Sequence, residues 1–340
     1  MALSNKQKKL LFSNLVRSMT LDRMMMRIIM AGKMVGFYHE GGISLAPGVA
    51  AGSFLRKDDP MWIHYRAHGI AEMVSKGIDV KSYVAEHMGR EAGCCKGRSS
   101  FHASFPDDHV FGSSGNIGAN FPACTGYGFA ARYKGTDQVV VNCSGDGSYH
   151  EGRAYEGMHM AATWKLPVIF WCQNNGMAQS SALTDVFPIE DISKVAASLG
   201  IRTLTVDGQD LFACGEAALK AIDHTRKGKG PIFVELKVLR SQEHNVGGLN
   251  NEGAEPRSQA LMEEWKATRD PLKLVTTKIL DEGLLTQKEI DKISADAEVE
   301  AEEIELFCEQ SPKATPSIED LMAQVYSPNK KEGVNNDYNT

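Results

Sequence analysis

Residues 138–147 read QVVVNCSGDG, and residues 168–176 read VIFWCQNNG. Each stretch is a short apolar run that ends in glycine, aspartate or asparagine, which is typical of a buried strand followed by a turn. We therefore predict strands at Gln138–Ser144 and Val168–Cys172, joined by a helix over about Gly152–Trp164. A strand, a helix and a second strand in this order form the unit from which parallel sheets are built.

The same alternation continues toward the C-terminus. We predict helices at about Asp191–Leu199 and Phe212–Lys227, and strands at Arg202–Val206 and Ile232–Leu239. Gly200 and Gly228 follow the two helices, where a glycine provides a left-handed cap. The predicted fold class is α/β, a parallel sheet with helices on both faces. The pattern does not resolve the strands of the first hundred residues.

Two segments stand outside this alternation. Residues Arg240–Ser258 are polar and rich in glycine and asparagine, and a loop of this length in a compact domain is usually functional or mobile. Residues Pro271–Gln310 predict two charged helices, the second with Thr286 as N-cap and Glu289 completing a capping box. We divide the chain into an α/β domain at 1–270, a helical outer layer of the same domain at 271–325 and a flexible tail at 326–340.

Composition excludes several function classes. The chain of 340 residues has 37 basic and 43 acidic side chains and a formal charge of −6, which does not suit a nucleic-acid partner. Its seven cysteines form no C-x-x-C pair, so we expect a reducing compartment and neither a disulfide framework nor a thiolate zinc site. No apolar run reaches the ~20 residues of a membrane span. We expect a cytoplasmic protein without a membrane partner.

The N-terminal segment is basic and poor in acids, as a mitochondrial transit peptide would be. Its apolar residues between Leu15 and Met30 recur at helical spacing, however, so a packed first helix is the better interpretation. The adjacent methionines 24–26 are interpreted as filler of a core or an interface.

Asp146 and Asn175 follow the two strands quoted above. Because ligands of parallel α/β sheets bind beyond the carboxyl ends of the strands, these side chains are the first candidates for a site. Their oxygens suit Mg²⁺ or Ca²⁺, and the glycines beside Asp146 let a diphosphate approach the backbone. Gly-Asp-Gly alone could be a simple turn, but the offset of 175 − 146 = 29 residues places both ends on neighbouring strands.

Two other motifs carry less information. Residues Gly126–Ala131 match G-x-G-x-x-A, but no strand precedes them, so close helix packing explains the small residues better than a dinucleotide site. His64 and His68 have i, i+4 spacing in HYRAHG at 64–69, which is not enough to indicate a metal pair.

The pairing of G-D-G with N-N about thirty residues later is the signature of thiamine-diphosphate enzymes. Further stretches, namely GFYH at 36–39, YRAHG at 65–69, GSSGNIGANFP at 112–122 and GKGPIFVEL at 228–236, make the chain resemble one family over about residues 10–325. That family contains the α-subunits of the first component of pyruvate, branched-chain 2-oxoacid and acetoin dehydrogenases. The resemblance implies the phosphate-binding half of the thiamine-diphosphate-binding fold.

The resemblance also implies a role for individual residues. It assigns Mg²⁺ to the side chains of Asp146 and Asn175 and the backbone oxygen of Met177. It implies that the cofactor is bound by Phe37, Tyr65, Arg66, Gly115, Ile117, Gly145, Gly147, Ser148 and His244, with Tyr65, Arg66 and His244 at the diphosphate and Gly115 and Ile117 at the aminopyrimidine. Phe37 and His39 would line the substrate side, and His39 and His244 are the candidate proton carriers, with ordinary pKa values near neutrality.

By the same resemblance, the reaction is that of a thiamine-diphosphate- and Mg²⁺-dependent oxidoreductase. A carbanion of the cofactor attacks a 2-oxo acid or an acyloin, and the acyl unit passes to a lipoyl-bearing acyltransferase or another acceptor. The family's activating glutamate comes from a β-subunit in an α₂β₂ heterotetramer, and neither Glu151 nor Glu156 suits that role. Two alternatives stay open, a transketolase-like carboligase and a non-catalytic binding subunit.

The loop at 240–258 departs from the family pattern. Typical members carry His-Ser and then Ser-Asp-Pro, whereas here His244 is followed by Asn245 and a glycine- and asparagine-rich stretch. Asn245 matches the serine that mammalian pyruvate dehydrogenases offer for phosphorylation, so we expect that switch to be absent. Since this loop closes over the cofactor in the family, its divergence leaves the substrate and the acyl acceptor open.

Overall fold

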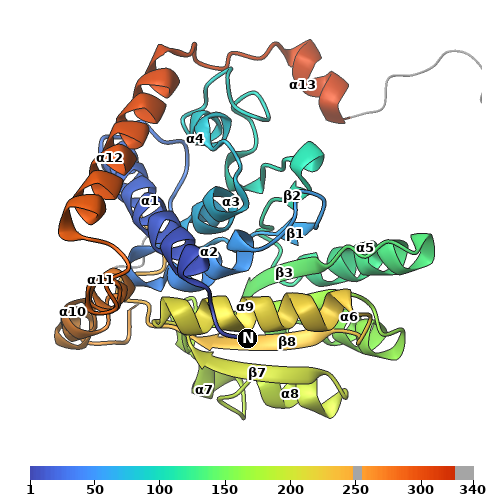
Figure 1. Ribbon diagram of the computed structural model, residues 1–340. Coiled ribbons are helices and arrows are strands. Elements are labelled where there is room, and N and C mark those ends of the chain that lie inside the picture. Colours follow the sequence, from blue (N-terminus) through green and yellow to red (C-terminus); the bar gives the residue numbers. More distant parts are fainter. Residues whose placement is uncertain (248–254, 326–340) are drawn as a thin grey trace, which may run out of the picture.

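Six parallel strands form the central sheet of the part of the chain that the computed structural model describes, residues 1–247 and 255–325 (Figure 1). Across the sheet they are β2 (Val110–Phe111), β1 (Met61–Trp62), β3 (Val140–Gly145), β4 (Val168–Asn174), β8 (Ile232–Lys237) and β7 (Arg202–Asp207). The short strands β5 (Met177–Ala178) and β6 (Ser181–Ala182) pair separately. The predicted parallel α/β fold is confirmed. The predicted tail at 326–340 and residues 248–254 of the predicted loop lie outside the described residues.

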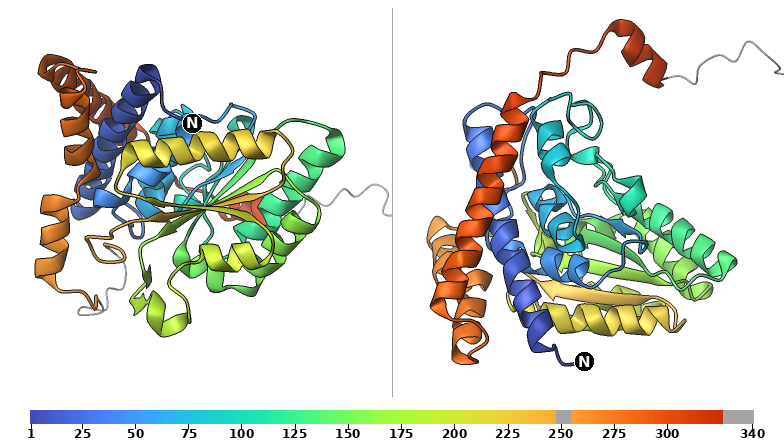
Figure 2. Two further views of the ribbon diagram at one scale, coloured as in Figure 1. Left: turned by 60° about the horizontal axis from the view of Figure 1, so that its bottom comes forward. Right: turned by 45° about the horizontal axis from the view of Figure 1, so that its top comes forward.

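Side chains of the central strands alternate between two hydrophobic clusters, one on each face of the sheet. In β4, Ile169 and Trp171 belong to one cluster, whereas Val168, Phe170 and Cys172 belong to the other. The first cluster joins the sheet to α2 (Ala46–Ser53), α3 (Ile70–Lys76), α9 (Leu211–Arg226) and α1 (Asn5–Met30), and the second joins it to α5 (Asn120–Lys134), α6 (Gly152–Thr163) and α8 (Ser193–Ser198). Figure 2 shows α9 and α8 on opposite sides of the sheet.

The remaining helices lie around this core. They are α4 (Lys81–His87), α7 (Leu183–Val186), α10 (Gln259–Thr268), α11 (Pro271–Asp281), α12 (Gln287–Gln310) and α13 (Ile318–Val325). The capping box of Thr286 and Glu289 at the start of α12 is formed as predicted. Helix α10 was not predicted, because its single buried residue, Met262, gives no readable periodicity.

Helix α12 runs alongside α1 (Figures 1 and 2). Arg17 and Arg23 of α1 form ion pairs with Glu300 and Glu298 of α12, at 2.7 and 2.9 Å. The basic character of the N-terminal segment therefore has a structural use, as one side of a charged helix interface. Met24 and Met25 are fully buried, which confirms their interpretation as core residues.

Strands β1 and β2 have only two residues each, which is too short for an alternating pattern that would predict them from the sequence. Their position matters more than their length. The chain passes from β1 outward to β2 and then returns to β3 on the other side of β1. A reversal of this kind opens a crevice at the carboxyl ends of the strands, where α/β proteins bind ligands.

Two further observations bear on the sequence predictions. None of the helices in the described ranges is both long and apolar enough to cross a membrane. All seven cysteines are free thiols, in agreement with the expected lack of a disulfide framework.

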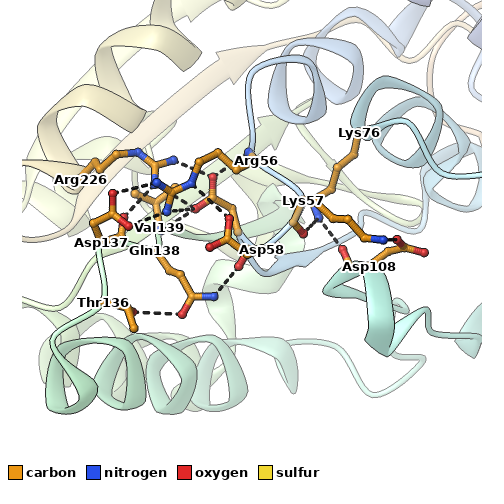
Figure 3. Close-up of polar contacts among 11 residues, drawn as sticks. Arg56, Lys57, Asp58, Lys76, Asp108, Thr136, Asp137, Gln138, Val139 and Arg226 are labelled. Carbon is orange, nitrogen blue, oxygen red and sulfur yellow. Dashed lines mark hydrogen bonds and ion pairs between the residues drawn. The ribbon is translucent and has the colours of Figure 1, made fainter.

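The amino ends of β1 and β3 are fixed by a buried carboxylate, Asp59. Its oxygens accept hydrogen bonds from the backbone N–H groups of Arg56 and Val139, at 2.8 and 3.0 Å, and from the guanidinium of Arg226, at 2.6 and 3.2 Å. Figure 3 shows the arginines and Asp137 gathered at this corner. Because Val139 donates to Asp59, strand β3 begins at Val140 and not at the predicted Gln138.

We expect Asp59→Ala to lower the free energy of unfolding by about 3 kcal/mol or more, because it leaves the Arg226 cation and two N–H groups without their partner. Asp58→Ala is the matched control, since the Asp58 side chain is 54% exposed and its single ion pair among the described residues is with Arg56. That change should cost under about 1 kcal/mol. Urea unfolding of both variants measures the difference, and equal losses would contradict this account.

Candidate functional site

A cavity of about 390 Å³ lies beyond the carboxyl ends of the parallel strands. Tyr65 follows β1, Gly115 follows β2, and Gly145 ends β3. Ten residues predicted for the site line the cavity: Phe37, His39, Tyr65, Gly115, Ile117, Gly145, Gly147, Ser148, Met177 and His244. The structure thus brings together segments that lie more than 200 residues apart in sequence.

The three other predicted residues, Arg66, Asp146 and Asn175, adjoin this lining. Asp146 directly follows Gly145 at the end of β3, and Asn175 directly follows β4. The register pairs Gly145 with Gln173, so the two strand ends lie side by side as predicted from the 29-residue offset. The backbone N–H of Asn175 donates to Oδ1 of Asp146 at 3.2 Å.

Asp146 and Asn175 each present an oxygen that lacks a partner. Within the described ranges, Oδ2 of Asp146 and Oδ1 of Asn175 are buried and make no hydrogen bond. Burial raises the pKa of the Asp146 carboxyl to about 7, because the charged form is poorly solvated there. A buried carboxylate and an amide oxygen with free lone pairs fit a hard divalent cation, which would supply the missing partner.

Glycines keep the space beside Asp146 open. A Cβ atom on Gly145 would lie 3.1 Å from Nε2 of His64, and one on Gly147 would lie 3.2 Å from Cβ of Ala178. Residues Asp146–His150 form a 3-10 turn, and α6 begins only at Gly152. The backbone amides nearest to Asp146 therefore belong to this turn and not to α6.

Arg66 is a buried cation without a carboxylate partner. Its side chain is 3% exposed, and Nη1 donates to the carbonyl oxygens of His244 and Glu40 at 2.8 and 3.2 Å. Among the described residues, Nη2 has no hydrogen-bond partner and no acid forms an ion pair with this guanidinium. Burial lowers the pKa of Arg66 from its ordinary value. A phosphate group would supply both the charge and the acceptors that Arg66 lacks.

The two site histidines have pKa values below the ordinary range of histidine. Burial, reinforced by the Arg66 charge, lowers the pKa of His244 to about 4 and holds that of His39 far below its usual range. Both rings line the cavity, with centroids 4.8 Å apart. Each is a neutral imidazole at pH 7, able to accept a proton but not to donate one from an imidazolium.

Sequence reasoning missed part of the lining, namely Phe101, Ser114, Glu151, Ala178 and Gln179. Ala178 and Gln179 belong to the β5–β6 hairpin, whose two-residue strands carry no readable pattern. Phe101 lies in a 3-10 turn, which could not be predicted because the sequence has no apolar periodicity there. Glu151 was set aside as following the diphosphate-binding turn, yet it reaches the edge of the cavity.

The described flanks of the predicted loop are anchored. Arg240, 1% exposed, donates to the carboxylate of Glu255 at 2.7 Å and to the carbonyl of Gln179 at 2.8 Å. Val246 pairs with Tyr38 through two backbone hydrogen bonds of 2.8 Å. These contacts hold His244 against the cavity.

Comparison with known proteins agrees with this geometry. The sequence model of the family described as "Dehydrogenase E1 component" matches residues 16–317. The chain belongs to this family. The α-subunit of the pyruvate dehydrogenase E1 component from Rhizobium meliloti (strain 1021) is 32% identical over 272 residues, which cover 80% of this chain and 76% of that protein.

Two further relatives span most of the chain. The human somatic mitochondrial α-subunit of pyruvate dehydrogenase E1 is 32% identical over 300 residues, which cover 86% of this chain and 72% of that protein. The α-subunit of acetoin:2,6-dichlorophenolindophenol oxidoreductase from Cupriavidus necator is 32% identical over 296 residues, which cover 87% and 86%. The resemblance drawn from the sequence motifs is confirmed, and with it the prediction of an E1-type enzyme α-subunit.

We expect Arg66→Met to weaken the binding of Mg²⁺-pyrophosphate to the purified chain by roughly 10- to 100-fold, because a charge-assisted contact to phosphate is lost. The unfolding free energy should change by no more than about 1 kcal/mol, since the relieved desolvation of an unpaired cation offsets the two lost hydrogen bonds. Calorimetric titration and urea unfolding measure the two effects.

Arg202→Met, at an exposed position of β7, is the matched control and should leave pyrophosphate binding unchanged. A large loss of stability in Arg66→Met with unchanged binding would show that Arg66 is structural.

Proposed function

We propose that the chain is the α-subunit of a thiamine-diphosphate- and Mg²⁺-dependent E1 enzyme that acts on a 2-oxo acid or an acyloin and passes the acyl unit to a lipoyl group or another acceptor. The observation that carries this proposal is the set of unsatisfied buried groups around one cavity. Within the described residues, Oδ2 of Asp146 and Oδ1 of Asn175 have no hydrogen-bond partner, and no acid forms an ion pair with Arg66. A divalent cation and a diphosphate together satisfy all of them.

The residues present allow each part of the cofactor to be assigned. Asp146, Asn175 and the backbone oxygen of Met177 would hold the metal. Tyr65, Arg66 and His244 would contact the diphosphate, with the turn of Gly145, Gly147 and Ser148 beside it, and Gly115 and Ile117 would contact the aminopyrimidine. When bound, thiamine diphosphate supplies a nucleophilic carbon and an electron sink for the bonding electrons of the substrate.

In the proposed reaction, the residues of this chain exclude water from the cavity and accept or return protons. Phe37 and Phe101 line the cavity with their rings 5.5 Å apart and present apolar surface to the substrate side. His39 and His244 are neutral, so each offers a lone pair to a reacting group. With a diphosphate beside Arg66 to raise their pKa values, each would accept a proton and return it later. The acetoin-related relative supports an acyloin as a substrate alongside the 2-oxo acids.

The acidic side chains around the cavity support the need for a β-subunit partner. In the described part of the chain, Glu151 is the only carboxylate that lines the cavity, and it follows the turn that carries Asp146. We therefore assign the activating glutamate of the family to a β-subunit within an α₂β₂ heterotetramer. The relatives named above are themselves α-subunits, which supports this assembly.

Mg²⁺ and thiamine diphosphate together should stabilise the chain assembled with its β-subunit, because a ligand of the native state adds RT ln(1 + [L]/Kd), or roughly 3 kcal/mol at a hundredfold excess over Kd. Asp146→Ala should abolish this increment, and Asp185→Ala, at an exposed acid of α7, should preserve it. Thermal unfolding with each ligand alone and with both gives the comparison. An undiminished increment in Asp146→Ala would overturn the metal assignment.

The purified chain alone should neither decarboxylate 2-oxo acids nor ligate aldehydes, because it lacks the partner's glutamate. Activity should appear on mixing with the β-subunit, and a β-subunit with that glutamate changed to glutamine serves as the control. Steady-state assays with pyruvate and acetoin test this. Turnover by the single chain at ~1 per second or more would indicate a self-sufficient enzyme instead.

A further inference from the structure

Three buried histidines form a chain of ring contacts that leads from the cavity into the core. Nδ1 of His39 lies 3.1 Å from Nε2 of His68, and Nδ1 of His68 lies 2.7 Å from Nε2 of His87. The chain ends where Nδ1 of His87 meets the backbone carbonyl of Tyr83 at 2.9 Å. All three side chains are at most 6% exposed, and only His39 lines the cavity.

The carbonyl of Tyr83 fixes the direction of every hydrogen bond in this chain. A carbonyl oxygen only accepts, so Nδ1 of His87 must carry the proton and donate. Burial lowers the pKa of His87 to about 4 and holds that of His68 well below its ordinary value, so both rings are neutral. A neutral imidazole has one donor and one acceptor nitrogen. Nε2 of His87 therefore accepts from Nδ1–H of His68, whose own Nε2 is left as an acceptor.

The position of the ring proton of His39 follows from its contacts with His68. Nε2 of His68 is an acceptor, and it faces both the backbone N–H of His39, at 3.3 Å, and the Nδ1 atom of the same residue. Two unprotonated nitrogens 3.1 Å apart would repel each other through their lone pairs, so Nδ1 of His39 carries a proton and shares the acceptor with the backbone N–H. Because Nδ1 points inward to His68, Nε2 is the nitrogen of His39 that remains available to a ligand, and in the neutral ring it carries the lone pair.

The backbone at His68 is held in a costly conformation. Ala67 and His68 both have φ of +49°, and Gly69 follows with +75°. Left-handed backbone is unfavourable at non-glycine residues, and such residues concentrate at functional sites. The hydroxyl of Tyr83 donates to the carbonyl of His68 at 2.6 Å, and the N–H of Ala67 donates to the carbonyl of His39 at 2.7 Å. The surrounding contacts thus fix His68 between the other two histidines.

We propose that His68 and His87 are positioning residues that fix the tautomer of His39, with Nδ1–H bound inward and the Nε2 lone pair directed to the cavity. Nε2 of His39 then always presents its lone pair at the substrate side. The ring proton of His39 does not have to move through solvent before this acceptor is available. The catalytic meaning of this arrangement rests on the proposed function, but the tautomer itself does not.

Replacement of His87 should allow His39 to change its tautomer. In His87→Met, Nδ1–H of His68 loses its acceptor in a buried environment, which is unfavourable because a buried donor is left without a partner. His68 can avoid this loss by moving its proton to Nε2 and donating to His39, which then carries its own proton on Nε2 and presents a donor to the cavity. In His87→Gln, the side-chain oxygen can accept from His68 while the amide donates to Tyr83, so the original arrangement is preserved.

Nitrogen NMR of ¹⁵N-histidine-labelled chain assembled with its β-subunit distinguishes protonated from unprotonated ring nitrogens without any assay of activity. We expect His39 of the parent protein to be protonated at Nδ1 and not at Nε2, His87→Met to reverse or mix the two forms, and His87→Gln to restore the parent form. In parallel, kcat of His87→Met should fall roughly 10- to 100-fold with the KM for thiamine diphosphate nearly unchanged, and His87→Gln should recover most of it.

Protonation of His39 at Nε2 in the parent protein would overturn the proposal, and this result needs no variant to fold. An unchanged His39 tautomer in folded His87→Met would remove the positioning role of His87. If the tautomer changes as expected while kcat stays at the parent value, the role of His39 in the proposed reaction is wrong and the histidine chain stands.

Discussion

A buried charge without a partner is the constraint around which this structure is arranged. Asp146 and Arg66 lie in the protein interior, and within the described ranges neither forms an ion pair. Burial of such groups disfavours the folded state, so a chain that retains both must recover the cost when a ligand binds. The sheet is buried on both faces by hydrophobic clusters. The stability that these clusters provide offsets the unfavourable burial of Asp146 and Arg66.

Sheet order explains why these groups meet. Strands β3 and β4 are parallel neighbours in register, so the residues that follow them meet at one edge of the sheet. The sequence revealed this part of the site because a strand that is buried on both faces reads as a continuous apolar run, and the turn residues after it stand out. Asp146 and Asn175 could therefore be predicted with their spacing, and the family resemblance added Arg66 and His244.

Other parts of the site could not be predicted, for a physical reason in each case. Strands β1 and β2 are too short for any periodicity, so the positions of Tyr65 and Gly115 followed from resemblance alone. The histidine chain joins residues 39, 68 and 87 through tertiary contacts, and spacing in sequence does not encode such contacts. Likewise, the low pKa of His244 arises from burial under segments that are remote in sequence.

Charge and burial also couple the two halves of the site. Burial is the main cause of the low pKa values of His39, His64 and His244, and the Arg66 cation lowers them further, so each histidine is less basic while that charge is unopposed. A diphosphate beside Arg66 would oppose this charge and would raise all three pKa values from that side, because a nearby anion favours the imidazolium. The histidines would then be better proton acceptors with the diphosphate in place than without it. In the proposed reaction, proton transfer at the substrate side would thereby depend, through one buried arginine, on whether the phosphate side is occupied.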